Sequence, residues 1–221
     1  MRLIIRDLKK TIGDKTLIDN ASYSFRAGIT YGIVGKKNSG KTDFLKCLCG
    51  EYELDDGYVK LEADWVEYDT KYSDFGFVSE NCVVPEFMTG YEFFESFKSF
   101  HNSKFDEKLT ADDYFDLINI SPEMRGRLIK DYSVFDKRRI QLLSILVFKP
   151  SVIILDDPLK NSKQCGNLKK IIELIKDRII IIATRNPVIA KELCDECIYI
   201  RDGKINNIDK SELDAFLSIG E

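Results

Sequence analysis

The chain has 221 residues, with 33 Lys or Arg against 37 Asp or Glu, and its formal net charge is −4. This length can bury a sizeable core, and the slightly acidic balance lacks the basic footprint of a nucleic-acid-binding protein. The longest apolar runs, at 152–155 and 179–183, are far shorter than the ~20 residues of a membrane helix. The first residues, "MRLIIRDLKK", have too short an apolar stretch for a signal peptide, so we expect none. We therefore expect a cytoplasmic protein with no nucleic-acid partner.

Short alternating segments occupy the first thirty-four residues, separated by turn residues at 13–14 and 27–28. Apolar–polar alternation between such turns predicts antiparallel strands. The stretch 41–50 then has apolar residues on one helical face and ends at a glycine, which predicts a short helix. A second β-like region follows at 57–69 and 75–79.

From residue 80 to about 148 the pattern becomes helical, with helix-like segments at 91–100, 110–118 and 136–148. The last third alternates between the two apolar runs and helical segments, of which 187–193 has Asn186 as a natural cap. Continuous β-branched runs separated by helices predict a parallel sheet that is buried on both faces.

A closing hairpin is expected over 197–208, around Asp202 and Gly203. Just before it, Cys194 and Cys197 form a CxxC pair with no second pair. One pair is a weak metal or redox signal, so we expect both to be buried structural thiols.

Residues 35–42, "GKKNSGKT", follow an apolar strand and precede a helix. The GxxxxGK[ST] spacing lets successive backbone N–H groups converge on phosphates at a helix N-terminus. Lys41 would reach the terminal phosphates, and the Thr42 hydroxyl would contact Mg²⁺. The predicted nucleotide-binding residues of this loop are Gly35, Lys36, Lys37, Asn38, Ser39, Gly40, Lys41, Thr42 and Asp43.

A second motif, "VIILDDP" at 152–158, delivers Asp156 to the end of a predicted strand. Ligands of open α/β sheets bind at that edge, so we expect the Asp156 carboxylate to hold Mg²⁺ through water.

These motifs, in their order, resemble the nucleotide-binding subunit of ABC transporters over essentially the full length of the chain. Residues 6–42 look like the family's opening hairpins and phosphate loop, "FGFVSE" at 75–80 like its Q-loop, 131–158 like the stretch from signature to acidic strand, and 179–205 like its switch region and last hairpin. The resemblance implies an α/β P-loop NTPase fold of ABC type, with ATP and Mg²⁺ as cofactors.

The same resemblance implies how one domain, 1–221, is organised. We expect a core over 1–79 and 151–221, which has a mixed parallel sheet and an N-terminal antiparallel β subdomain. A helical lobe is expected over 80–150.

Several positions depart from the family pattern. The adenine-stacking aromatic falls at Ile12, which still offers apolar contact for the base but lacks ring stacking. The Q-loop glutamine falls at Glu80, whose carboxylate could contact Mg²⁺ or its waters, or could serve only as a hinge to the lobe.

The family signature, usually Leu-Ser-Gly-Gly-Gln, reads "YSVFD" at 132–136. Val134 and Phe135 replace glycines that let backbone approach a partner's γ-phosphate, and Asp136 adds a negative charge. We expect this surface to clamp a partner's ATP poorly.

The glutamate that polarises the attacking water falls at Asp157, whose carboxylate is retracted by about 1 Å, and misplacement on that scale can cost ~10²-fold in rate. Lys163 stands where the next loop has an aspartate, and Arg185 replaces the switch histidine. Arginine can hold a γ-phosphate but cannot manage proton and water as histidine does.

The resulting hypothesis is an ABC transporter ATP-binding subunit that binds Mg-ATP and hydrolyses it slowly, with Asp157, Arg185 and Glu80 as the catalytic candidates. It would lie on the inner face of the membrane through a separate transmembrane subunit and pair with another ABC ATPase subunit, a heterodimer being favoured. The segment at 88–100 favours export. The alternative is a non-hydrolysing, nucleotide-gated regulatory or assembly module of the same fold.

Overall fold

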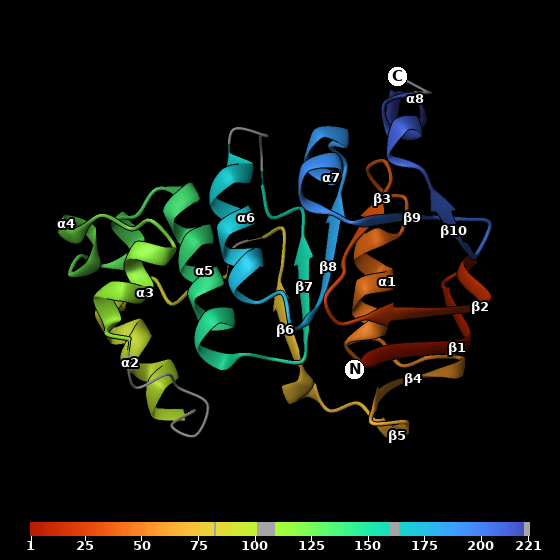
Figure 1. Ribbon diagram of the computed structural model, residues 1–221, viewed down its shortest axis with the longest axis horizontal. Coiled ribbons are helices and arrows are strands. Elements are labelled where there is room, and N and C mark those ends of the chain that lie inside the picture. Colours follow the sequence, from red (N-terminus) through yellow and green to blue (C-terminus); the bar gives the residue numbers. More distant parts are fainter. Residues whose placement is uncertain (82, 101–108, 160–163, 219–221) are drawn as a thin grey trace.

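The computed structural model describes residues 1–81, 83–100, 109–159 and 164–218. Lys163, predicted to replace the family's loop aspartate, lies outside these residues. The described strands form two sheets, one in the order β2-β1-β4-β5 and one in the order β10-β9-β3-β8-β7-β6 (Figure 1).

The strands are β1 (Arg2–Ile12), β2 (Lys15–Arg26), β3 (Thr30–Val34), β4 (Asp56–Ala63), β5 (Val66–Asp69), β6 (Phe75–Val78), β7 (Val152–Asp156), β8 (Ile179–Thr184), β9 (Glu196–Arg201) and β10 (Lys204–Ile208). The α-helices are α1 (Lys41–Leu48), α2 (Gly90–Phe100), α3 (Ala111–Leu117), α4 (Pro122–Arg125), α5 (Val134–Phe148), α6 (Cys165–Leu174), α7 (Pro187–Leu193) and α8 (Leu213–Ser218). Short 3-10 turns lie at η1 (Tyr72–Asp74), η2 (Ile129–Asp131) and η4 (Lys210–Glu212).

The N-terminal antiparallel sheet is confirmed for β1 and β2, which pair antiparallel across the turn at Gly13, where φ is +58°. The third predicted strand of this region was placed wrongly. β3 leaves the antiparallel sheet and pairs in parallel with β8 and β9. All five of its residues are buried, because it lies inside a sheet that is covered on both faces.

The six-stranded sheet divides the core into two clusters, and successive residues of its strands alternate between them. Ile153 and Ile180 pack with the helices of one face, while Ile154 and Ile181 pack with α1 and the antiparallel sheet. Figure 1 shows α1 beside the antiparallel sheet, and α2, α3, α4 and α5 gathered on the other side of the molecule. The predicted α/β class, with a mixed sheet and an antiparallel β sheet, is confirmed.

Local signals placed most helix ends correctly. Asn186 caps α7 as predicted, since its side chain accepts from the N–H groups of Val188 and Ile189. α5 instead begins two residues before its predicted start at 136, because Ser133 caps it. The closing hairpin forms around Gly203 as expected.

Cys194 and Cys197 are buried free thiols, as predicted. Among the described residues, no helix is both long and apolar enough to cross a bilayer.

Candidate functional site

The phosphate loop lies between β3 and α1, at the carboxyl end of the parallel strands. Its backbone needs left-handed residues at Asn38, with φ +62°, and at Gly40, with φ +88°. A Cβ at Gly40 would also lie 2.4 Å from Leu17 Cδ1, so glycine is required there. Asparagine tolerates the left-handed region better than most residues, which explains its place at 38.

Lys41 lies across the mouth of this loop. Its Nζ donates to Gly35 O at 2.6 Å, to Lys36 O at 2.7 Å and to Ser39 Oγ at 3.2 Å. Burial lowers the pKa of Lys41, against the charges of Asp157 and Asp156, which raise it. The loop thus holds the Lys41 ammonium at the edge of the cavity, and an anion that bound there would compete with the loop oxygens for its N–H groups.

Thr42 and Asp156 meet beside the loop. The Thr42 hydroxyl donates to Asp156 Oδ2 at 2.7 Å, and Asp156 is only 2% exposed at the end of β7. Burial raises the pKa of Asp156. Among the described residues, no cluster of three His, Cys, Asp or Glu could hold a metal. Mg²⁺ in phosphate sites characteristically uses one or two protein ligands plus phosphates and waters, and this hydroxyl–carboxylate pair fits that pattern.

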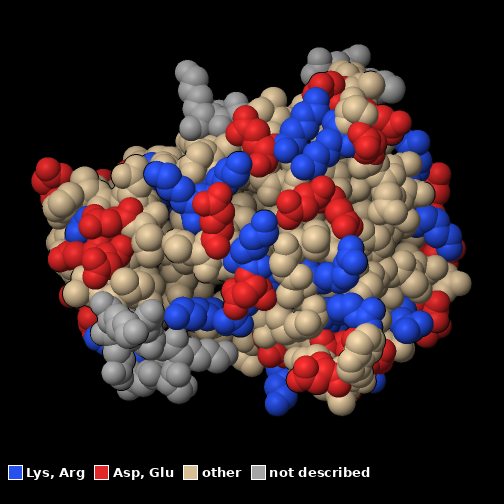
Figure 2. Space-filling view, in the orientation of Figure 1, with Lys and Arg blue, Asp and Glu red and all other residues tan. Residues whose placement is uncertain are grey.

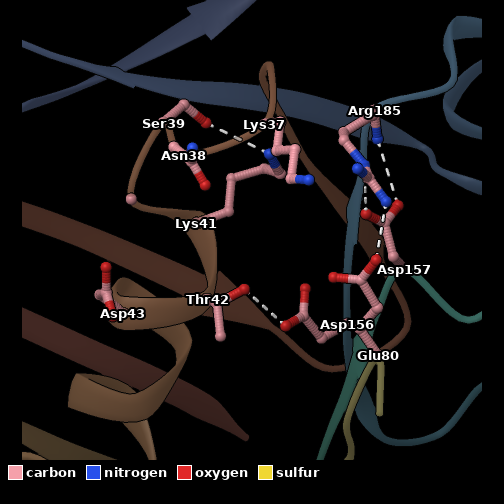
Figure 3. A pocket seen from close by; sticks show the side chains of 11 residues that line it. Lys37, Asn38, Ser39, Lys41, Thr42, Asp43, Glu80, Asp156, Asp157 and Arg185 are labelled. Carbon is pink, nitrogen blue, oxygen red and sulfur yellow. Dashed lines mark hydrogen bonds and ion pairs between the residues drawn. The ribbon is translucent and has the colours of Figure 1, made fainter.

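The three catalytic candidates form one ion-pair cluster. Arg185 Nε donates to Asp157 Oδ2 at 2.7 Å, and its Nη2 donates to Glu80 Oε1 at 2.8 Å (Figure 3). The Arg185 backbone N–H also donates to Asp157 Oδ1 at 3.3 Å. The charge of Asp157, more than any other cause, raises the pKa of Arg185. The arginine therefore holds both carboxylates on one side of the cavity.

A cavity of about 260 Å³ brings most of the predicted residues together. It is lined by Lys37, Asn38, Ser39, Gly40, Lys41, Thr42, Asp43, Glu80, Asp156, Asp157 and Arg185. In Figure 3, Lys37 and Lys41 of the loop lie across this cavity from the ion-pair cluster of Arg185, Asp157 and Glu80. Gly35, Lys36 and Ile12 do not line this cavity, and Ile12 is 41% exposed at the end of β1. Lys/Arg and Asp/Glu side chains are interspersed over the face seen in Figure 2.

The stretch that resembles the family signature forms the start of α5. Ser133 Oγ accepts from Asp136 N at 3.1 Å and donates to Asp136 Oδ2 at 2.7 Å. Val134 is 61% exposed, whereas Phe135 lies under Arg139, whose guanidinium carbon is 3.8 Å from the ring centroid. The helix end is thus capped by its own side chains.

Sequence reasoning missed Arg138, which donates to the backbone oxygens of Asp157 and Glu80 at 3.0 and 2.9 Å. The only signal was a run of three cations, Lys137, Arg138 and Arg139, and the run does not indicate which of them faces the site.

Comparisons with known proteins agree on one family. A family model described as "ABC transporter" matches residues 18–160. An uncharacterized ABC transporter ATP-binding protein of Bacillus subtilis, YhcH, is 25% identical over 93% of this chain and 69% of its own length. The phosphonates import ATP-binding protein PhnC of Fusobacterium nucleatum is 25% identical over 91% of this chain and 89% of its own length. A putative ABC transporter ATP-binding protein from Pyrococcus furiosus superposes with a TM-score of 0.76 at 22% identity, covering 90% of this chain and 97% of that one.

Proposed function

This chain belongs to the ABC transporter family as an ATP-binding subunit, and from that premise we propose that it binds Mg-ATP at the phosphate loop and hydrolyses it slowly. The observation that carries the proposal is that Lys41, Thr42 and Asp156 line one and the same cavity. A cation for phosphate and a hydroxyl–carboxylate pair for Mg²⁺ face the same space.

The roles follow from the contacts. Lys41 would exchange its bonds to the loop oxygens for bonds to the terminal phosphates, and the loop N–H groups would hold the remaining oxygens. Thr42 and Asp156 would hold Mg²⁺, directly and through water respectively. Bound Mg²⁺ would neutralise charge on the phosphate oxygens. Glu80 lines the same cavity, so we keep it as a contact to Mg²⁺ or its waters.

Slow hydrolysis is supported by the state of Asp157. The Asp157 side chain is 12% exposed and paired with Arg185. Its carboxylate is therefore held in an ion pair, in addition to being one methylene shorter than a glutamate. To polarise a water, Asp157 would have to share its oxygens with this ion pair, which weakens it as a base. Arg185 would be drawn towards a γ-phosphate by charge.

For partners, we propose a separate transmembrane subunit and a second ABC ATPase subunit, with the heterodimer preferred. The self-capped start of α5, with Val134 projecting from it, is a poor surface for another chain's ATP. We propose that the chain lies in the cytoplasm, on the inner face of the membrane, through the transmembrane subunit. The domain division at 79/80 and 150/151 belongs to the same proposal.

Different observations favour export and import as the direction of transport. The segment 88–100 supports export by its resemblance to exporters, while the Fusobacterium relative is named as an import protein. Export remains a prediction. Accumulation of substrate in inverted vesicles that contain the complex would bear it out, and ATP-dependent loss from them would refute it.

The alternative, a nucleotide-gated module that does not hydrolyse ATP, rests on the same altered residues. Phosphate release by the complex with its membrane partner separates the two functions. Turnover that is lost in Lys41→Ala supports the ATPase, whereas Mg-ATP binding without turnover supports the module. Absence of Mg-ATP binding would refute both.

A further inference from the structure

Arg138 joins two loops that carry catalytic candidates. It lies in the second turn of α5, and its Nη1 donates to the backbone oxygen of Asp157 at 3.0 Å. Its Nη2 donates to the backbone oxygen of Glu80 at 2.9 Å. These residues follow different strands, β7 and β6, so one guanidinium holds both loop backbones.

The backbone conformation of Asp157 is one that its surroundings must hold in place. Its φ is +43°, in the left-handed region that non-glycine residues occupy at a cost in energy and only when their surroundings hold them there. The Asp157 N–H donates to Ala183 O at 2.9 Å, and its carboxylate pairs with Arg185. Arg138 supplies the remaining restraint, on the carbonyl.

We propose that Arg138 is a positioning residue that sets the carboxylates of Glu80 and Asp157 from α5. This inference rests on the proposed function of the site. Because α5 also packs against α2 and α3, a movement of these helices relative to the sheet would shift both carboxylates together. Arg138 thereby links the helices to the side of the cavity that would face the γ-phosphate of a bound nucleotide.

The planar fork of arginine is what suits it to this role, because two nitrogens on one rigid plane can reach two carbonyls. Lysine keeps the charge but has a single ammonium on a flexible stem. Arg138 and Arg185 line the same open cavity, together with Glu80 and Asp157. Both arginines hold Glu80 and Asp157 in place. Arg185 binds their carboxylates, and Arg138 binds their backbone oxygens.

The neighbouring residue provides a matched control. Lys137 directly precedes Arg138 in α5, is a cation, and pairs with Glu86 at 2.5 Å. It does not line either cavity beside Asp157. Lys137→Gln therefore removes one charge and one lobe contact without touching either loop carbonyl.

The test is hydrogen exchange on the whole chain without nucleotide, comparing Arg138→Gln, Arg138→Lys and Lys137→Gln with the wild type. For both Arg138 variants we expect the amides of 79–81 and of Asp156, Asp157 and Leu159 to exchange roughly tenfold faster, in both loops at once, because a shared restraint is lost. Lys137→Gln should leave both loops at wild-type rates. Unchanged exchange in either loop of Arg138→Gln would overturn the proposal.

Kinetics provide the second readout. At saturating Mg-ATP we expect kcat of Arg138→Gln to fall by about 10- to 100-fold, with KM within about twofold, since misplacement of a catalytic group lowers kcat. A rise in KM with kcat unchanged would overturn the positioning role. If the wild type itself bound no Mg-ATP, the proposed function would fail, while the exchange result would still decide whether Arg138 restrains both loops.

Discussion

Replacing Lys41 tests the nucleotide site most directly. Nζ makes three bonds to its own loop, to Gly35 O, Lys36 O and Ser39 Oγ. On nucleotide binding, at least two of these bonds would be exchanged for bonds to phosphate oxygens. Hydrogen bonds to charged groups contribute about 1.5–3 kcal/mol each net of the bonds that they replace, so Lys41→Ala should cost about 3–6 kcal/mol of binding free energy. A Coulomb estimate of about 4 kcal/mol at 4 Å and an effective dielectric constant of about 20 agrees.

That loss corresponds to a roughly 10²- to 10⁴-fold weaker dissociation constant for Mg-ATP, measured by titration calorimetry. Lys41→Met keeps the buried aliphatic stem, so a loss shared by both variants is a loss of the ammonium and not of loop packing. Lys46→Ala is the matched control on α1, because Lys46 contacts Glu51 and the ring of Tyr52 instead of the loop. A loss of less than about tenfold in both Lys41 variants would refute the assignment of the phosphate loop.

Three further predictions concern the acidic side of the site. Asp157→Glu should raise phosphate release at saturating Mg-ATP by about tenfold, because its longer carboxylate reaches further; an unchanged rate would contradict the retracted-base argument. Asp157→Asn with Mg-ATP should remain a monomer by light scattering, since the projecting Val134 and the self-capped start of α5 obstruct the clamp, and a stable ATP-dependent homodimer would disprove this. Asp156→Asn should weaken Mg-ATP binding yet raise the melting temperature of the nucleotide-free protein. Burial raises the pKa of Asp156, so the contribution of Asp156 to folding stability falls as pH rises from the ordinary carboxyl pKa of about 3.9 through the raised one. The gain in melting temperature of Asp156→Asn should therefore be larger at about pH 7 than at about pH 4. A gain that does not depend on pH would refute the direction of the pKa shift.

Much of the fold could be predicted because its signals are local. The β-branched runs of β7 and β8, the cap at Asn186 and the turn at Gly203 each depend on a few neighbouring residues. The sheet membership of β3 could not be predicted in this way. β3 follows two antiparallel strands directly, but its partners β8 and β9 lie about 150 residues further along the chain, and no short pattern encodes that pairing.

The candidate site likewise has a part that local sequence predicts and a part that it does not. The loop residues from Lys37 to Asp43 line one cavity because the motif itself fixes their spacing. The contact between Arg185 and Glu80 spans 105 residues, and that between Arg138 and Glu80 spans 58. The first contact depends on where β6 and β8 end relative to one another, and the second on how α5 packs beside β6. The separate motifs therefore indicated Arg185 and Glu80 but not their ion pair, and they did not indicate Arg138.

The start of α5 shows how the structure changes the physical reason behind a prediction. The sequence attributes a poor clamp to side chains at both Val134 and Phe135. In the structure Phe135 is folded under Arg139, so Val134 is the side chain that projects. The N–H of Asp136, a donor that a helix N-terminus could offer to a phosphate, is already bonded to Ser133. The Asp136 carboxylate stands beside it and pairs with Arg139 at 3.1 Å. A phosphate approaching this helix would therefore meet a projecting Val134, a donor already in use and a carboxylate that already holds the nearest cation.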